Sequence, residues 1–561
     1  ANGAGGRIIA WADQQAAVFG QFDVTPGIKT GAGGFVEASS GDMLIFGANV
    51  NSGIDDRRGT LLLDPKNITI AGSGGGGGSG AYNLQAMMGY GYSGGKNLNQ
   101  SLDTSDYFGA SVSLDGNRLA VGARGDRGSG NSRSTSGAVY LYSFTDASFS
   151  GAALEAIVGH GYSGGKNVNQ SLDAYDYFGW AVALDGNRLA VGSYYADGYN
   201  NGRSGSGDVY LYTFSNSTFS GGNLAGMIGH GYTGGKNINV SLGTSDVFGA
   251  ALSLDGNRLV VGAPYGDGSG NSRSGSGEIY LYTFSNSTFS GGALAGVIGH
   301  GYSGGKNINQ SLDTNDYFGW AVSLDGNRLA VGSRYASGSG NSRPGSGEVH
   351  LYTFTDSAFS GGELAGRIGH GYSGGKNINQ SLDTYDQFGF SIALDGNRLA
   401  VGAYGDRAST NSESYAGKVY LYTFTDSALS GGSLDAEIGD GYTGGKNINV
   451  PLSAYDYFGW SVSLDGNQLV VGSMGGDGSG NSRTNSGDVY LYTISSPSDS
   501  ISSAVFATNS SSASTITPTT IATALSAGTN VVLQANNDIT VSEAITAANG
   551  SGDGGNLTLQ A

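Results

Sequence analysis

The chain has 561 residues, of which 103 are glycine and none is cysteine, and its formal net charge at pH 7 is −18. The absence of cysteine excludes disulfide bonds, thiolate metal sites and cysteine nucleophiles. The acidic balance disfavours nucleic acid as a partner, because phosphate binding needs a basic face. The glycines follow no Gly-X-Y period, which excludes collagen. No apolar run reaches the ~18 residues of a membrane-spanning helix.

Residues 1–71 hold short apolar runs separated by glycine and Asn/Asp turns, without a helical stripe. Evenly spaced short strands of this kind favour a β-solenoid, in which each coil stacks on the one before. The chain begins at Ala1 with no signal peptide, as we expect for a processed protein or for a fragment of a longer one.

Three of these segments resemble the stalk of filamentous-haemagglutinin-like exoproteins of two-partner secretion. They are residues 6–13, residues 34–37 and residues 59–70, the last with the sequence Gly-Thr-Leu-Leu-Leu-Asp-Pro-Lys-Asn-Ile-Thr-Ile. The resemblance implies a right-handed parallel β-helix located outside a Gram-negative-type cell. The secretion domain of that family is not recognisable in the sequence, which favours a fragment.

A glycine-rich linker at residues 72–80 leads into a repeat that spans residues 81–494. The segment Asp-Tyr-Phe-Gly at residues 106–109 and the turn Asp-Gly-Asn at residues 115–117 recur with a step of 70 residues in six units. A fixed long period with several markers in register is the signature of a repeat architecture.

Each 70-residue unit predicts four strands, which we name d, a, b and c. In the second unit they are residues 154–162, 178–184, 188–193 and 209–214. Small residues alternate along a and b, and aromatic residues gather on c, as in a propeller blade that narrows toward a common axis. The long connections d→a and b→c then lie on one face of the propeller.

The Phe-Gly…Val-Gly-Ala pattern of all six units resembles the FG-GAP repeats of integrin α-subunit propellers. In that family an Asp-x-Asp-x-Asp-Gly loop binds calcium, whereas this chain has a bare Leu-Asp-Gly-Asn turn there. The first strand d, at residues 84–92, has no a–b–c set before it, and the last c strand, at residues 489–494, has no d after it. We therefore predict that these two strands pair and close a six-bladed ring.

Residues 495–520 are rich in Ser, Thr and Ala, which predicts a linker. Residues 521–561 return to the short apolar runs of the amino-terminal segment, and we interpret them as further coils of the same β-helix. The sequence thus predicts an all-β protein with a six-bladed propeller inserted in a parallel β-helical stalk.

Two sets of polar residues are candidate sites. Paired aspartates in glycine-rich loops could hold Ca²⁺; the alternative is that they cap turns through their own backbone. The pairs are Asp103 with Asp106, Asp173 with Asp176, Asp313 with Asp316, and Asp383 with Asp386.

A Lys-Asn dipeptide forms a second repeated set, expected on the long-loop face. Such residues suit contact with a glycan or a peptide, and the alternative is a plain solvated loop. The set is Lys96, Asn97, Lys166, Asn167, Lys236, Asn237, Lys306, Asn307, Lys376, Asn377, Lys446 and Asn447.

Two further features are interpreted as structural. His160, His230, His300 and His370 occupy one place in four units, too far apart around an axis to share a metal ion. The tripeptide at residues 124–126 is Arg-Gly-Asp, a motif that some integrins bind. It is expected in an exposed b→c loop, and we interpret it as sequence drift.

No nucleophile–base–acid set, phosphate loop or Cys/His metal spacing is present, so we do not expect an enzyme. The first functional hypothesis is an extracellular bacterial surface adhesin or exoprotein, whose stalk displays a propeller that binds a glycan or a protein through its long-loop face. The alternative is a structural module of a cell-surface or matrix filament, in which the propeller is a spacer or a lateral contact with neighbouring copies. Neither hypothesis involves nucleic acid or membrane insertion.

Overall fold

The computed structural model describes residues 82–407, 409 and 414–494 with their side chains, and ten short strands of the flanking segments as backbone. The chain divides into two compact units, residues 81–494 and residues 1–80 together with 495–561. Within the described parts, no helix is long and apolar enough to cross a membrane.

The flanking segments form a solenoid of parallel strands. One sheet has the order β1 (Arg7–Ala12), β3 (Phe35–Ser40), β5 (Thr60–Asp64), β38 (Asn530–Gln534) and β40 (Leu557–Gln560). A second pairs β2 (Gln15–Asp23) with β4 (Met43–Asn51), and a third has the order β37 (Ser514–Ile516), β6 (Ile68–Ile70) and β39 (Ile539–Val541). All these pairings are parallel.

The two flanks share one solenoid, because Leu61 of β5 pairs with Val531 of β38 across the inserted propeller. The strand β37 lies inside the range 495–520 that was predicted to be linker, so the solenoid resumes by residue 514. A three-residue strand among Ser and Thr leaves too little periodicity to be recognised. The linker at residues 72–80 lies outside the described residues, and the right-handed sense of the coil stays a prediction.

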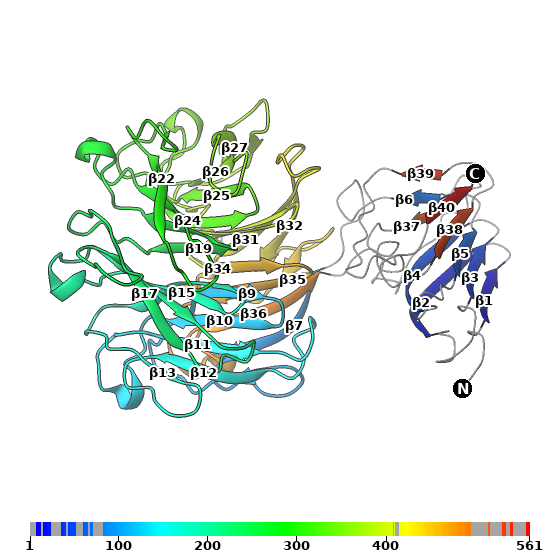
Figure 1. Cartoon of the computed structure of the whole chain (residues 1–561), viewed down its shortest axis with the longest axis horizontal. Coiled ribbons are helices and arrows are strands. Elements are labelled where there is room, and N and C mark those ends of the chain that lie inside the picture. Colours follow the sequence, from blue (N-terminus) through cyan, green and yellow to red (C-terminus); the bar gives the residue numbers. More distant parts are fainter. Residues whose placement is uncertain are drawn as a thin grey trace. The chain divides into compact units, whose positions relative to one another are not determined.

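The propeller has six sheets of five strands each (Figure 1). Blade 1 comprises β9 (Phe108–Asp115), β10 (Arg118–Ala123), β11 (Ala138–Ser143), β12 (Ala153–Gly159) and β13 (Val168–Asn169). Blade 2 comprises β14 (Phe178–Asp185), β15 (Arg188–Ser193), β16 (Asp208–Thr213), β17 (Asn223–Gly229) and β18 (Ile238–Asn239). Blade 3 comprises β19 (Ala251–Asp255), β20 (Arg258–Ala263), β21 (Glu278–Thr283), β22 (Ala293–Gly299) and β23 (Ile308–Asn309).

The remaining blades repeat this order. Blade 4 comprises β24 (Phe318–Asp325), β25 (Arg328–Ser333), β26 (Glu348–Thr353), β27 (Glu363–Gly369) and β28 (Ile378–Asn379). Blade 5 comprises β29 (Ser391–Asp395), β30 (Arg398–Ala403), β31 (Lys418–Thr423), β32 (Ser433–Gly439) and β33 (Ile448–Asn449). Blade 6 comprises β34 (Phe458–Asp465), β35 (Gln468–Ser473), β36 (Asp488–Ile494), β7 (Tyr82–Gly89) and β8 (Leu98–Asn99). Where the b→c loops are fully described, which leaves out that of blade 5, each also forms a short 3₁₀ turn, at Ser129–Asn131, Tyr199–Asn201, Ser269–Asn271, Ser339–Asn341 and Ser479–Asn481.

The sixth blade closes the ring as predicted. β36 pairs antiparallel with β7, from Asp488 opposite Gly89 to Ile494 opposite Tyr82. Figure 1 shows the blue strand β7 beside the orange strand β36, although more than 390 residues separate them in the sequence. β7 begins at Tyr82, two residues earlier than expected. Its pairing with β36 leaves no open sheet edge between the first and last repeats.

The fifth strand of each blade was not predicted. It has two residues and pairs in parallel with strand d, as Met88 does with Leu98 in blade 6. The d→a connection therefore doubles back along the outer edge of the blade before it crosses to the next one. Two residues inside a polar, glycine-rich stretch carry no recognisable strand pattern.

The blades pack tightly against one another. A Cβ atom added at Gly122 would lie 2.0 Å from the carbonyl oxygen of Gly179 in the next blade, and the same position in the other blades is equally close. Behind this contact the fully buried Phe108 ring packs edge-on against Tyr140, with ring centres 5.6 Å apart. The small residues of strands a and b thus let the sheets converge on the axis.

The Asp-Gly-Asn turns join each blade to the next. Asp115 Oδ2 accepts a hydrogen bond from the Gly186 N–H at 2.8 Å, and Asp255 and Asp325 accept the equivalent bonds from Gly326 and Gly396 at 2.9 Å. Asp465 accepts the bond from Gly116 and completes the circle. The aspartate that stands at the family's calcium loop therefore binds neighbouring backbone in this chain.

Candidate binding site at the channel mouth

The six repeats differ at a position that faces the central axis. The third residue of the innermost strand segment is small in two blades and a large aromatic in four, and the series is Ala110, Trp180, Ala250, Trp320, Phe390 and Trp460. Three of the chain's four tryptophans are in this one ring. Positions that build the blades, such as the Phe-Gly and Asp-Gly-Asn segments, are the same in every unit.

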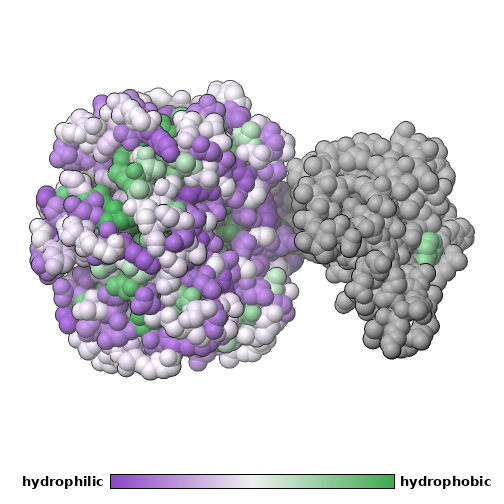
Figure 2. Space-filling model, in the orientation of Figure 1, coloured by the Kyte–Doolittle hydropathy of each residue, from purple (hydrophilic) through white to green (hydrophobic). Residues whose placement is uncertain are grey.

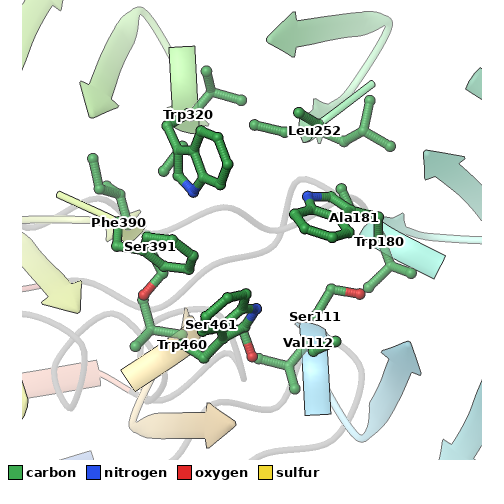
Figure 3. A pocket seen from close by; sticks show the side chains of 18 residues that line it. Ser111, Val112, Trp180, Ala181, Leu252, Trp320, Phe390, Ser391, Trp460 and Ser461 are labelled. Carbon is green, nitrogen blue, oxygen red and sulfur yellow. The ribbon is translucent and has the colours of Figure 1, made fainter. Parts of the chain in front are cut away.

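The four aromatic side chains form a nearly closed ring around a hollow (Figure 3). Ring centres are 6.4 Å apart for Trp180 and Trp320, 5.4 Å for Trp320 and Phe390, and 4.4 Å for Phe390 and Trp460. The guanidinium of Arg124 fills the remaining gap, 4.6 Å from the Trp180 ring and 5.5 Å from the Trp460 ring. The hollow has a volume of about 90 Å³, room for about three water molecules, so a large ligand would sit over the ring and only a small group of it could enter the hollow.

A second layer covers the ring on the side of the long loops. It is formed by the residue that follows strand b in each blade, and four of these residues contact the aromatic ring directly. Tyr194 stacks on Trp180 at 4.0 Å, Arg334 lies 3.4 Å from the centre of the Trp320 ring, and Tyr404 lies 4.9 Å from Trp460. With Arg124, this layer places two cations and two phenol rings at the mouth of the channel.

The two arginines of this layer have no acidic partner among the residues whose side chains the structure describes. No carboxylate of a described residue lies within ion-pair distance of Arg124 or Arg334. Arg124 Nε donates to the sulfur of Met474 at 3.2 Å, and burial lowers the pKa of its guanidinium. Arg334 Nη1 donates to Gln387 Oε1 at 3.4 Å, and its buried Nε finds no acceptor among the described residues.

Exposed tyrosines continue the aromatic surface outward. All six of the most exposed tyrosines lie in the d→a and b→c loops: Tyr175, Tyr195, Tyr199, Tyr385, Tyr415 and Tyr455. One path runs from Trp460 through Tyr457 to Tyr455, with ring centres 5.8 and 6.2 Å apart, and Tyr415 stacks on Tyr455. Flat rings that are half open to solvent suit stacking against the apolar face of a sugar or against a peptide.

A larger hollow of about 310 Å³ opens beside this path. Arg343, Tyr385, Arg407 and Tyr415 are among the residues that line it. It lies on the same loop face, so the channel mouth and this hollow belong to one surface.

The repeated lysines lie elsewhere than predicted. Lys96 Nζ donates to the carbonyl oxygen of Ser148, and Lys236 Nζ to that of Thr288, both in the turn between strands c and d of the next blade. In an antiparallel sheet that turn is at the opposite end from the b→c loop. Four of the lysines therefore join blades at the outer edge, while Lys166 and Lys446 pair with Glu155 and Asp435 of their own blade. They do not form a ring on the long-loop face, because the d→a connection doubles back along the blade.

The asparagines of this set are equally engaged. Asn97 Oδ1 accepts a hydrogen bond from the Met87 N–H at 2.8 Å, and the same bond recurs in all six units. This bond holds the d→a connection against strand d of the same blade. A ligand-binding role for the Lys-Asn residues stays a prediction, and the contacts seen here are those of a structural tie.

The paired aspartates act as turn caps. Asp106 Oδ2 accepts a hydrogen bond from the backbone N–H of Asp103 at 2.6 Å, and Asp246 and Asp456 make the same bond to Gly243 and Ser453, where no pair exists. The other aspartate of the pair holds a neighbouring loop: Asp103 pairs with Arg483 at 3.2 Å. No group of three or more acidic or histidine side chains among the described residues could hold a metal ion. Calcium binding at the paired aspartates stays a prediction, and the contacts seen here are those of turn caps.

Besides the capping aspartates, each blade buries a carboxylate below the long loops, in the b→c loop or at the start of strand c, that was not predicted from the sequence. They are Asp126, Asp208, Glu278, Glu348, Asp406 and Asp488. Most accept hydrogen bonds from tyrosine hydroxyls, as Asp126 does from Tyr140 at 2.7 Å and Asp208 from Tyr232 at 2.8 Å. Burial raises the pKa of Asp208 and of Asp488 to about 7.

The buried carboxylate comes from one of two places in the repeat. In blades 1 and 5 it is in the b→c loop, and the first residue of strand c is Ala138 or Lys418. In the other blades it is the first residue of strand c, and the loop position is Ala or Gly. The two positions lie close together, since a Cβ at Gly476 would lie 2.3 Å from Asp488 Oδ2, so one carboxylate at either position occupies the same part of the blade. This exchange is visible in aligned repeats and could have revealed the site.

The Arg-Gly-Asp tripeptide is not an exposed loop, contrary to expectation. Arg124 lies among the rings of the channel mouth, and Asp126 is buried and bonded to Tyr140 and Tyr162. The four repeated histidines lie at the ends of the d strands, where the carbonyl oxygen of His160 accepts a hydrogen bond from Ser129 N–H. Neither group forms a site of its own.

A comparison with known protein families matches the FG-GAP repeat at residues 102–142, 172–212, 242–282, 312–352, 382–422 and 452–492. Each match begins before strand a and ends in strand c of one unit. A comparison with curated proteins gives no match. The propeller of this chain is built from six FG-GAP repeats, one for each a–b–c set.

Proposed function

We propose that this chain is part of an extracellular bacterial surface adhesin or exoprotein, in which a β-solenoid stalk carries a propeller that binds a glycan or a protein. The FG-GAP repeats are compatible with an adhesion-type surface module. The resemblance of the flanks to filamentous-haemagglutinin-like exoproteins supports a position at the cell surface, reached by two-partner secretion. The negative net charge suits a soluble extracellular surface.

One observation carries the proposal: the repeat loses its regularity at the channel mouth. Near-identical units would place six identical residues around the axis, yet this chain has four large aromatic rings and two alanines there, and two unpaired arginines above them. A plug that only fills the channel needs apolar volume and no guanidinium. Aromatic and arginine side chains that surround a small hollow are typical of recognition surfaces.

An array of glycans and surface proteins, probed with the full chain, tests the proposal. Replacing Tyr195 and Tyr455 together by alanine should weaken binding to any ligand found by at least tenfold, because these exposed rings form the approach to the mouth. The matched control is Leu154→Ala, which removes an equally exposed side chain at the outer edge of a blade. Absence of any binding partner, or equal losses for both variants, would contradict the proposal.

A second candidate function is that of a structural module in a filament. Six leucines at the start of the d strands are exposed by 36–47%: Leu84, Leu154, Leu224, Leu294, Leu364 and Leu434. They recur once per blade and could contact neighbouring copies. Figure 2 shows the hydrophobic residues of the visible propeller surface as separate green spots on a mainly hydrophilic surface, which suits weak lateral contacts at most. Electron microscopy of native fibres would show regular stacking of propellers if this function is correct.

A further inference from the structure

We infer that the channel mouth recognises a carboxylate-bearing glycan, with Arg124 and Arg334 each binding an acidic sugar residue whose ring stacks on the neighbouring aromatic side chains. The inference rests on the proposed binding function and specifies its ligand. Three observations support it: the unpaired arginines, the hydrogen-bond donors that face the hollow, and the aromatic path to the rim.

The first observation is the contrast between two groups of arginines on one face. Four arginines of the b→c loops pair with an aspartate of an adjacent loop: Arg133 with Asp173, Arg273 with Asp313, Arg343 with Asp383, and Arg483 with Asp103, at 3.1–3.4 Å. Arg124 and Arg334 have no such partner among the described residues, and neither do Arg127 and Arg203 of the same loops. What distinguishes Arg124 and Arg334 is that they lie against the aromatic ring, at 4.6 and 3.4 Å from Trp180 and Trp320. A guanidinium held partly away from water without a carboxylate opposes folding, and an anionic ligand would remove that penalty.

The second observation is the polarity of the hollow. Figure 3 shows the indole nitrogens of Trp180 and Trp320 on the sides of their rings that face the hollow, and that of Trp460 on the side of its ring toward Ser111. An indole N–H can only donate, and no aspartate or glutamate is among the residues that line the hollow. The hydroxyls of Ser111, Ser391 and Ser461 donate to backbone carbonyls of the next blade and so remain acceptors only. Donors of the mouth therefore outnumber strong acceptors, which favours an anion.

The third observation distinguishes a sugar from other anions. Tyr404 and the path from Tyr457 to Tyr455 present flat rings beside the two cations, while the buried Tyr194 stacks on Trp180 and supports this layer. Such rings pack against the C–H face of a pyranose, while the fork of an arginine matches a carboxylate with two parallel bonds. Nucleic acid, with a charge on every phosphate, would be repelled by the surrounding acidic surface, whereas a short carboxylated glycan needs only the local cations.

The test uses the full chain and titration calorimetry at fixed ionic strength. The probes are uronate and sialate oligosaccharides, each with its methyl ester, which keeps the sugar and removes the charge. We expect at least one acid form to bind at least tenfold more tightly than its ester. The double variant Arg124→Gln with Arg334→Gln should bind acid and ester equally. The control Arg133→Gln with Arg273→Gln makes the same change in net charge on the same face and should keep the preference.

The outcomes separate this inference from the proposed function. If acids and esters bind the unmodified chain equally, or a poly-glutamate peptide binds as tightly as the best acid, the inference is wrong and the binding function stands. If no glycan or protein binds in any format, the proposed function fails as well. If the double variant does not fold, Arg334→Lys can replace it, because lysine keeps the charge but lacks the planar fork of the guanidinium. This variant should bind the acid form severalfold more weakly than the unmodified chain and the ester with unchanged affinity. Unchanged affinity for the acid form would overturn the inference.

Discussion

The closing strand β7 should contribute strongly to the stability of the whole ring. Met88 on this strand is fully buried against residues of β36, whereas Leu84, four residues earlier on the same strand, is 46% exposed. Replacing Met88 by alanine should cost about 2–5 kcal/mol, because a buried methionine leaves a cavity. Leu84→Ala should change stability by about 0.5 kcal/mol or less, as surface substitutions do.

The assay is thermal unfolding of the full chain followed by circular dichroism. With an unfolding entropy of about 2.1 cal/mol/K per residue, a propeller of roughly 410 residues loses about 1 °C in Tm per kcal/mol. Met88→Ala should therefore lower the Tm by about 2–5 °C, and Leu84→Ala by less than about 1 °C. Equal, small shifts for both variants would show that β7 does not dock on β36 in solution, and the closed six-bladed ring would be wrong.

Three further predictions concern packing, pH and calcium. Gly332→Ala places a Cβ 1.9 Å from the Gly389 carbonyl oxygen of the next blade and should lower the stability of the propeller by about 1–3 kcal/mol or more. In the same melting assay the control Gly202→Ala, whose Cβ would lie 3.1 Å from the nearest atom, should have a much smaller effect. Burial raises the pKa of Asp106 and Asp488 from 3.8 to about 7, so the native state binds more protons than the unfolded state between these pH values, and the stability should fall as the pH rises from about 4 to about 7. A Tm that is no higher at pH 5 than at pH 8 would contradict this prediction. The variant Asp488→Asn should reduce the difference in Tm between the two pH values. Excess chelator should leave the Tm unchanged, because the paired aspartates already bind backbone N–H groups and arginines; a clear decrease would show that calcium binds.

The propeller could be predicted from the sequence because its constraints are local and repeated. The Phe-Gly segment, the Asp-Gly-Asn turn and the aromatic strand c recur every 70 residues, so one unit specifies the blade and the order of units specifies the closure. The two-residue fifth strand and the strand β37 were missed, because segments of two or three residues have no periodicity to detect.

The site was harder to predict, since it depends on positions that differ between repeats. Trp180, Trp320 and Trp460 are far apart in the sequence, and only the closed ring brings them together. The Lys-Asn residues attracted attention because they are repeated, yet their repetition reflects a bond that every blade needs. In a repeat protein of near-identical units, residues that depart from the repeat at the axis are the better indicator of a binding surface.

The most direct test of the account is a structure of the full chain bound to a ligand that the array or calorimetry identifies. We predict that the ligand lies on the long-loop face over the channel mouth, in contact with Arg124 or Arg334 and with at least one of Tyr404 and Tyr455. A ligand bound at the outer edge of the blades, beside the exposed leucines or the repeated lysines, would contradict the central claim.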